Sequence, residues 1–82
     1  MMKDVQDAHY PTKDFLEAAF LRAKGIIYIA TEWPTPQQAF FVFKNPPDEL
    51  KSAWQRGDDQ VSTRALDQAM NFFRDELRST RP

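Results

Sequence analysis

The sequence predicts a small α+β domain in which a two-stranded antiparallel hairpin packs against three helices, in the order α-β-β-α-α. Three segments show apolar residues at helical spacing, and two short runs are rich in β-branched and aromatic residues. Glycine or proline separates each of these segments from the next. Because 82 residues make one domain, we expect a flexible tail over residues 1–11 and a single domain over 12–82.

The first three elements follow from local spacing. Residues 13–24 place their rings and methyl groups on one side of a helix, with Thr12 as the expected N-cap and Gly25 as the expected stop. The runs 26–31 and 39–43 are the expected strands. The segment 32–38 between them contains two prolines and is expected to be a loop. Both strands are apolar on both faces, which predicts that the chain's own helices leave one face uncovered.

The last two helices have recognisable start signals. Asn45 is the expected cap of a helix that takes Pro46 in its first position and ends at Gly57. Ser62 is the expected cap of the final helix, with Val61 before it packing on the first turns. The predicted core collects the apolar sides of all elements: Phe15, Ala19, Phe20, Ile27, Ile29, Phe41, Phe43, Leu50, Trp54, Leu66, Met70, Phe73 and Leu77.

The composition fits a chain that builds its core from rings. It contains seven Phe, two Trp and two Tyr, and aromatic side chains bury large apolar areas. With no cysteine and one histidine, disulfide and metal staples are not available to this sequence. Packing or self-association has to stabilise so short a chain, so a homodimer is one alternative.

Charge and hydropathy limit the partners. The formal net charge is −1, so no overall field steers the chain toward nucleic acid or an anionic membrane. No apolar run approaches the roughly 18 residues that cross a bilayer, and we expect no signal peptide. The sequence therefore predicts a cytoplasmic protein without a membrane partner.

Catalytic and metal-binding patterns are not found in the sequence. The one imidazole, His9, falls in the expected tail, and the two glycines, Gly25 and Gly57, cannot form a phosphate loop. Asp58 and Asp59 are expected to be solvated acids in a turn, and no cluster has metal-ligand spacing. We expect no enzyme, no cofactor and no metal.

The candidate partner-binding residues are aromatic: Trp33, Tyr28, Phe40 and Phe72. Trp33 either anchors a partner, as tryptophan does at interface hot spots, or folds back to close the open end of the core. Tyr28 and Phe40, with the neighbouring rings of the strands, are candidates for a platform that stacks single-stranded nucleic acid. The alternative for these rings is the core.

Arginines follow one side of the last helix and are candidate phosphate-binding residues: Arg64, Arg74, Arg78 and Arg81. Arginine is a common contact to phosphate oxygens. The alternative is a solvated helix face, on which cations near the C-terminus suit the helix dipole.

A resemblance to a known family rests on the following residues: Thr12-x-Asp14-Phe15-Leu16-x-Ala18-Ala19-x-Leu21-x-Ala23-x-Gly25, Phe41-Val42-Phe43, Leu50, Ala53-Trp54 and Val61-Ser62. With the amphipathic last helix they cover about residues 12–79. The chain resembles a family of small bacterial and phage-encoded domains of unknown function. The resemblance implies a bacterial, phage or mobile-element origin and carries over no activity. The Trp-Pro segment is longer than the hairpin connection of that family.

These observations favour a small non-catalytic protein-interaction or regulatory accessory domain, with an unknown protein or a second copy of the chain as its partner. The apolar surplus on the strands motivates this interpretation. The alternative is a single-stranded nucleic-acid-binding module that uses the hairpin aromatics and the arginines of the last helix.

Overall fold

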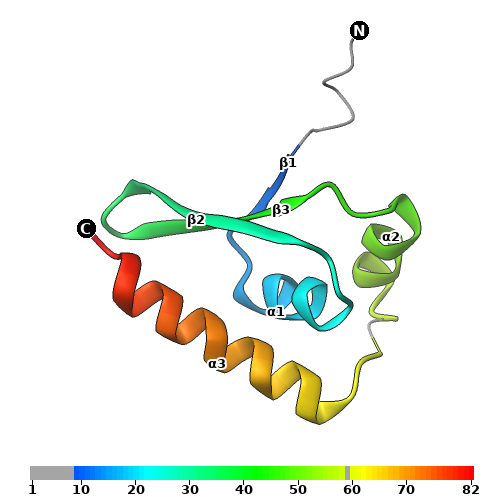
Figure 1. The fold of residues 1–82 in the computed structure, drawn as a ribbon. Helices are drawn as coiled ribbons and strands as arrows, with labels where there is room; N and C mark the ends of the chain where they lie inside the picture. Colours follow the sequence, from blue (N-terminus) through cyan, green and yellow to red (C-terminus); the bar gives the residue numbers. More distant parts are fainter. Residues whose placement is uncertain (1–8, 59) are drawn as a thin grey trace, which may run out of the picture.

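The computed structural model describes residues 9–58 and 60–82, and within them the chain forms three helices and one three-stranded antiparallel sheet (Figure 1). The elements are β1 (His9–Thr12), α1 (Phe15–Ala23), β2 (Tyr28–Thr35), β3 (Gln38–Lys44), α2 (Asp48–Arg56) and α3 (Thr63–Thr80). α1 and α3 lie on one side of the sheet, and α2 packs beside α1 through the rings of Trp54 and Phe20. The predicted α+β class is confirmed.

The sheet has the order β1-β3-β2, so the expected two-stranded hairpin is wrong by one strand. Tyr10 lies opposite Phe43 and Thr12 opposite Phe41, which pairs β1 with β3. β1 occupies residues that the sequence places mainly in the tail, and the rest of that tail, residues 1–8, lies outside the described residues. Pro11 is compatible with β1 because an edge strand needs hydrogen bonds on one side only.

The β2–β3 hairpin is antiparallel as predicted, but its turn is much shorter than the expected loop. Residues 32–35 continue β2, and only Pro36 and Gln37 connect the strands. Pro34 is tolerated because β2 is the other edge of the sheet and its register shifts between Glu32 and Thr35. Two prolines therefore mark an irregular edge strand here, and the prediction of a loop over 32–38 is wrong.

The first two helices begin later than predicted and end close to the predicted stops. Asp14, and not Thr12, caps α1, because its Oδ1 accepts the backbone N–H groups of Leu16 at 3.0 Å and Glu17 at 3.1 Å. α2 begins at Asp48, after the expected Asn45 and Pro46. Its predicted stop at Gly57 is confirmed, in the left-handed conformation with φ 77° that glycine adopts without strain.

The predicted cap of α3 is also confirmed. The Ser62 hydroxyl oxygen accepts the backbone N–H of Ala65 at 3.0 Å, and the helix then runs for 18 residues. Val61 packs against the core cluster, as expected for an apolar residue that precedes a cap. This length carries the C-terminus of α3 to the tip of the β2–β3 hairpin (Figure 1).

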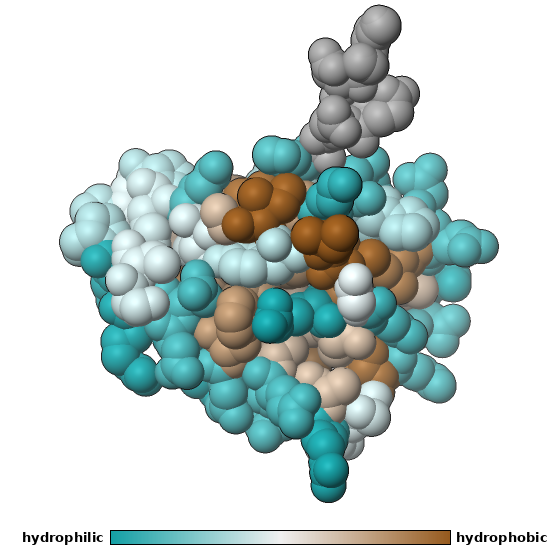
Figure 2. All heavy atoms as spheres, in the orientation of Figure 1, coloured by the Kyte–Doolittle hydropathy of each residue, from teal (hydrophilic) through white to brown (hydrophobic). Residues whose placement is uncertain are grey.

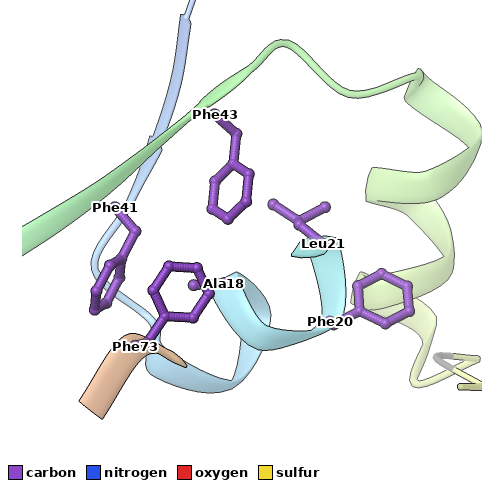
Figure 3. Packing of buried hydrophobic residues seen from close by; sticks show 6 residues of the cluster. All are labelled: Ala18, Phe20, Leu21, Phe41, Phe43 and Phe73. Carbon is purple, nitrogen blue, oxygen red and sulfur yellow. The ribbon is translucent and has the colours of Figure 1, made fainter. Parts of the chain in front are cut away.

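The core is a cluster of rings and small side chains between the sheet and the helices (Figure 3). Phe73 of α3 is fully buried, and its ring centroid lies 4.7 Å from that of Phe41 and 6.0 Å from that of Phe43. The other members of the buried cluster are Ala18, Phe20 and Leu21. Most predicted core residues are buried or pack against this cluster.

Two predicted core residues are wrong. The side chain of Ile27 is 60% exposed and that of Ile29 is 40% exposed. The position that faces the helices is Tyr28, opposite Phe43, and the register of β2 shifts just after it. Because successive strand residues point to opposite faces, turning Tyr28 inward leaves its neighbours outside the core.

A buried carboxylate fastens β1 to α1. Glu17 is 8% exposed, and its two oxygens accept hydrogen bonds of 2.7 Å from the hydroxyl groups of Tyr10 and Thr12. The Thr12 hydroxyl oxygen in turn accepts the backbone N–H of Asp14 at 3.1 Å. This network holds a strand of only four residues on the sheet.

Replacing Glu17 with Ala should lower the free energy of unfolding by about 1–3 kcal/mol, because two buried hydroxyl groups lose their acceptor. Urea denaturation followed by circular dichroism measures the change. Glu49→Ala, on the exposed side of α2, is the matched control and should stay within about 0.5 kcal/mol of the unchanged chain. Equal stability of both variants would contradict the role of Glu17.

Replacing Phe73 with Ala should cost about 3–5 kcal/mol, which approaches the whole stability of a small domain. We expect a chain that is largely unfolded at room temperature, seen as loss of the cooperative thermal transition. Phe73→Leu should keep a transition at lower temperature. Leu16→Ala, at a side chain that is 50% exposed, should change stability much less; a similar loss in both alanine variants would argue against a core centred on Phe73.

Candidate functional site

The outer sheet face is the side of the sheet that points away from α1 and α3. Phe41 and Phe43 face the helices, so the alternating residues Phe40, Val42 and Lys44 point the other way. Residues opposite them on the edge strands share this face. They are Glu32 opposite Phe40, Ala30 and Pro11 opposite Val42, and His9 opposite Lys44.

The centre of the outer sheet face is apolar and its two ends carry opposite charges. Ile27 and Ile29 flank it with large exposed side chains, Phe40 is half-buried, and Val42 at the centre is only 3% exposed. Glu32 lies toward the hairpin tip and Lys44 at the opposite end of β3. Figure 2 shows hydrophobic surface gathered over β2 and the segment that leads into it. In the described part of the chain, no helix covers this face (Figure 1).

A second surface, the hairpin-tip pocket, is a cavity of about 310 Å³ between the β2–β3 turn, the start of α1 and the end of α3. Its apolar lining consists of Phe15, Trp33, Ala39, Phe41 and Leu77. Its polar lining consists of Lys13, Gln37, Gln38 and Arg81. None of the described residues that line it is acidic.

Trp33 folds back against the end of α3. Its indole Nε1–H donates to the Thr80 hydroxyl oxygen at 2.9 Å, and the Arg81 guanidinium carbon lies 5.7 Å from the indole centroid. Arg81 Nε donates to the Pro36 carbonyl at 3.3 Å. Of the two interpretations of Trp33, this placement matches the one in which the ring closes an open end of the core, and it makes the ring one wall of the pocket.

The proposed nucleic-acid platform is not assembled. Tyr28 points toward the helices, with its ring centroid 5.4 Å from Phe72 and 5.3 Å from Phe73, and its hydroxyl donates to Glu76 Oε1 at 2.8 Å. Phe40 points to the opposite face of the sheet. Phe72 is half-buried, with the Arg22 guanidinium carbon 3.6 Å from its ring centroid. Strand alternation therefore separates Phe40 from Tyr28, whereas Tyr28 and Phe72 pack together on the helix side of the sheet.

The candidate phosphate-binding arginines are also dispersed. Arg64 lies in the first turn of α3, about 15 Å along the helix axis from Arg74. Arg74 donates to the Asn71 side chain at 3.0 Å, and Arg78 pairs with Asp75 at 3.2 Å. Arg81 is the one of the four that lines the hairpin-tip pocket. The spacing along the helix is as predicted, but the arginines do not converge on one point.

His9 and Asp58, the imidazole and one of the two turn acids that the sequence singles out, have exposed side chains. His9 belongs to β1 and not to a tail, with an exposed side chain. Asp58 is exposed beside Arg56 at 3.6 Å, and Asp59 lies outside the described residues. Among residues 9–58 and 60–82, no group of three or more acidic, histidine or cysteine side chains is placed to hold a metal ion. No helix in that same part of the chain has the length and apolar character to span a bilayer.

Sequence patterns identify few of the residues that form these two surfaces. The pattern places Ile27 and Ile29 in the core, although the apolar residues on both strand faces do predict an uncovered face. Lys13, Gln37 and Gln38 show no local signal, because the pocket joins segments that are far apart in the chain. The hydrogen bond from Trp33 to Thr80 places the hairpin tip against the end of α3, and these segments line the pocket together with Lys13.

Comparison with known proteins finds no matching family model, no matching curated protein and no matching solved structure. The resemblance over residues 12–79 therefore remains a prediction from the residue pattern.

Alkaline pH should weaken the fold through its two tyrosines. Burial, more than the carboxylate of Glu17 or Glu76, raises the pKa of Tyr10 and of Tyr28 from 10.0 to about 12. A raised pKa means that folding favours the neutral phenol, so this stabilisation is intact below pH 10 and is lost as the pH rises from 10 toward 12. Urea midpoints across this range should fall, and the double variant Tyr10→Phe/Tyr28→Phe should fall less. Parallel curves for the two proteins would contradict the assignment.

Proposed function

We propose that this chain is a non-catalytic protein-interaction domain that pairs with a second copy of itself through the outer sheet face. The observation that carries the proposal is the exposed aliphatic surface around Ile27 and Ile29, which lies between two ends of opposite charge. Large exposed apolar groups surrounded by polar residues are typical of protein interfaces. The absence of a nucleophile–base pair from the sequence motivates the non-catalytic part of the proposal.

The charges on the outer sheet face are self-complementary. Along β3, Phe40 and Lys44 lie at equal spacing on either side of Val42, and Glu32 lies beside Phe40. A two-fold axis that lies parallel to the face above Val42 and runs perpendicular to β3 therefore brings Glu32 of one protomer close to the partner's Lys44, and the reverse contact forms as well. Two ion pairs then flank an apolar centre. A second copy fits this surface better than a partner with a single sign of charge.

Self-association also meets the need of so short a chain. Its core is small, and covering the two isoleucines removes aliphatic surface from water that the helices leave exposed. Proline at position 34 and the register shifts of β2 oppose simple edge-to-edge extension of the sheet. Face-to-face contact is thus favoured over pairing through the β2 edge.

The nucleic-acid alternative has less support. Tyr28 is packed among the rings under the sheet, and the arginines of α3 point to separate neighbours. None of the contacts among the described residues favours nucleic-acid binding.

A charge-swap series tests the proposed pairing. Sedimentation velocity should show concentration-dependent dimers, and Glu32→Lys or Lys44→Glu alone should weaken dimerisation about tenfold, since two pairs change per dimer. The double variant Glu32→Lys/Lys44→Glu should restore association, because each pair is rebuilt with exchanged signs.

Glu49→Lys on α2 changes the net charge by the same amount as Glu32→Lys and serves as its matched control, with no expected effect on dimerisation. Far-UV circular dichroism verifies that each variant is folded. A monomer at all concentrations of the unchanged chain, or a double variant no better than the single ones, would exclude this arrangement.

A further inference from the structure

The hairpin-tip pocket combines an apolar floor with unneutralised positive charge. Its volume of about 310 Å³ is at the lower end of the range for small-ligand sites. Rings and an aliphatic side chain form the floor, and the amides of Gln37 and Gln38 stand at its rim. It uses none of the residues of the outer sheet face, so it is independent of the proposed dimer.

Two cations line this pocket, and neither has an acidic partner among the described residues. Lys13 is exposed at the start of α1. Asp14, its neighbour, is turned to the N–H groups of Leu16 and Glu17. The pocket therefore has a net positive charge that an anionic group can neutralise.

The Arg81 guanidinium is held in place before any ligand arrives. Its Nε bond to the Pro36 carbonyl and its position against the Trp33 ring fix the group at the pocket wall. Trp33 is itself fixed by its bond to Thr80. The two terminal nitrogens of the guanidinium are left for a ligand, and such a planar pair matches the two oxygens of a carboxylate.

We propose that the hairpin-tip pocket binds a carboxylate carried on a small apolar body with an aromatic or branched side chain. The apolar body lies on Phe15 and Leu77, and the carboxylate meets Arg81 and Lys13. One guanidinium and one ammonium can pair with either a carboxylate or a phosphate, and the apolar lining around Phe15 and Leu77 favours a carboxylate on an apolar body over a phosphate on a polar one. The same chemistry occurs at the C-terminus of a peptide and in a free amino-acid derivative.

Nuclear magnetic resonance titration of the full chain tests the site. N-acetylphenylalanine should shift the indole N–H resonance of Trp33 saturably, with a dissociation constant of about 1 mM or lower, as expected for a ligand of this size. N-acetylphenylalaninamide, which lacks the charge, should bind about tenfold more weakly. Equal affinities, or no saturable shift from the acid, would overturn the proposal.

Two further probes define the ligand. A tetrapeptide that ends in phenylalanine with a free carboxylate should bind more tightly than N-acetylphenylalanine if the pocket accepts a peptide terminus, and equally well if it accepts a free acid. Either result supports the shared chemistry. Tighter binding of adenosine monophosphate than of both acids would overturn the choice of a carboxylate.

Substitutions of the two cations test whether each one contacts the carboxylate of the ligand. Arg81→Gln and Lys13→Gln should each weaken binding of the acid about tenfold and leave the amide unaffected. Arg64→Gln removes an exposed cation from the other end of α3 and should change neither affinity. A loss of affinity for the acid and the amide alike would show that Arg81 only shapes the pocket. The charge-swap variants of the outer sheet face should bind the acid normally, which separates this site from the dimer.

Discussion

The contact of Phe73 with the sheet is the interaction on which the rest of the structure depends. Its fully buried ring lies within 6.0 Å of ring centroids from β2 and β3 and joins α3 to both strands. A chain without cysteine has no covalent link to do this, so packed rings have to hold the layers together. The Tyr28 side chain points toward the helices because it packs against these rings. Its neighbours Ile27 and Ile29 then point to the opposite face, because successive strand residues alternate.

The long last helix extends this contact to the tip of the hairpin. Phe73, Glu76 and Thr80 recur at the spacing of one helix face, and each contacts β2: through rings, through the Tyr28 hydroxyl and through the Trp33 indole. Arg81 completes the series at the Pro36 carbonyl. The hairpin is thereby held along the C-terminal half of α3. The pocket forms where this line of contacts ends.

Both proposed binding surfaces follow from placing α1 and α3 on a single side of the sheet. The opposite side keeps its aliphatic groups exposed, with Glu32 and Lys44 at its two ends. The pocket collects cations from the start of α1 and the end of α3, two helix ends that meet at the hairpin tip. One surface is broad and self-complementary, whereas the other is concave and positive. Their chemistry suits different partners, so the two proposals stand separately.

Local patterns alone were enough to place the helices, the Ser62 cap, the Gly57 stop and the rings of the core, because each signal is contained within a few turns of chain. They also predicted an uncovered strand face. The third strand, the continuation of β2 through Pro34 and the pocket depended on tertiary structure. His9 pairs with Lys44 and Trp33 bonds to Thr80, and partners so distant in the chain leave no periodicity in either segment. Residues brought together only by packing carry no spacing that a sequence pattern can detect.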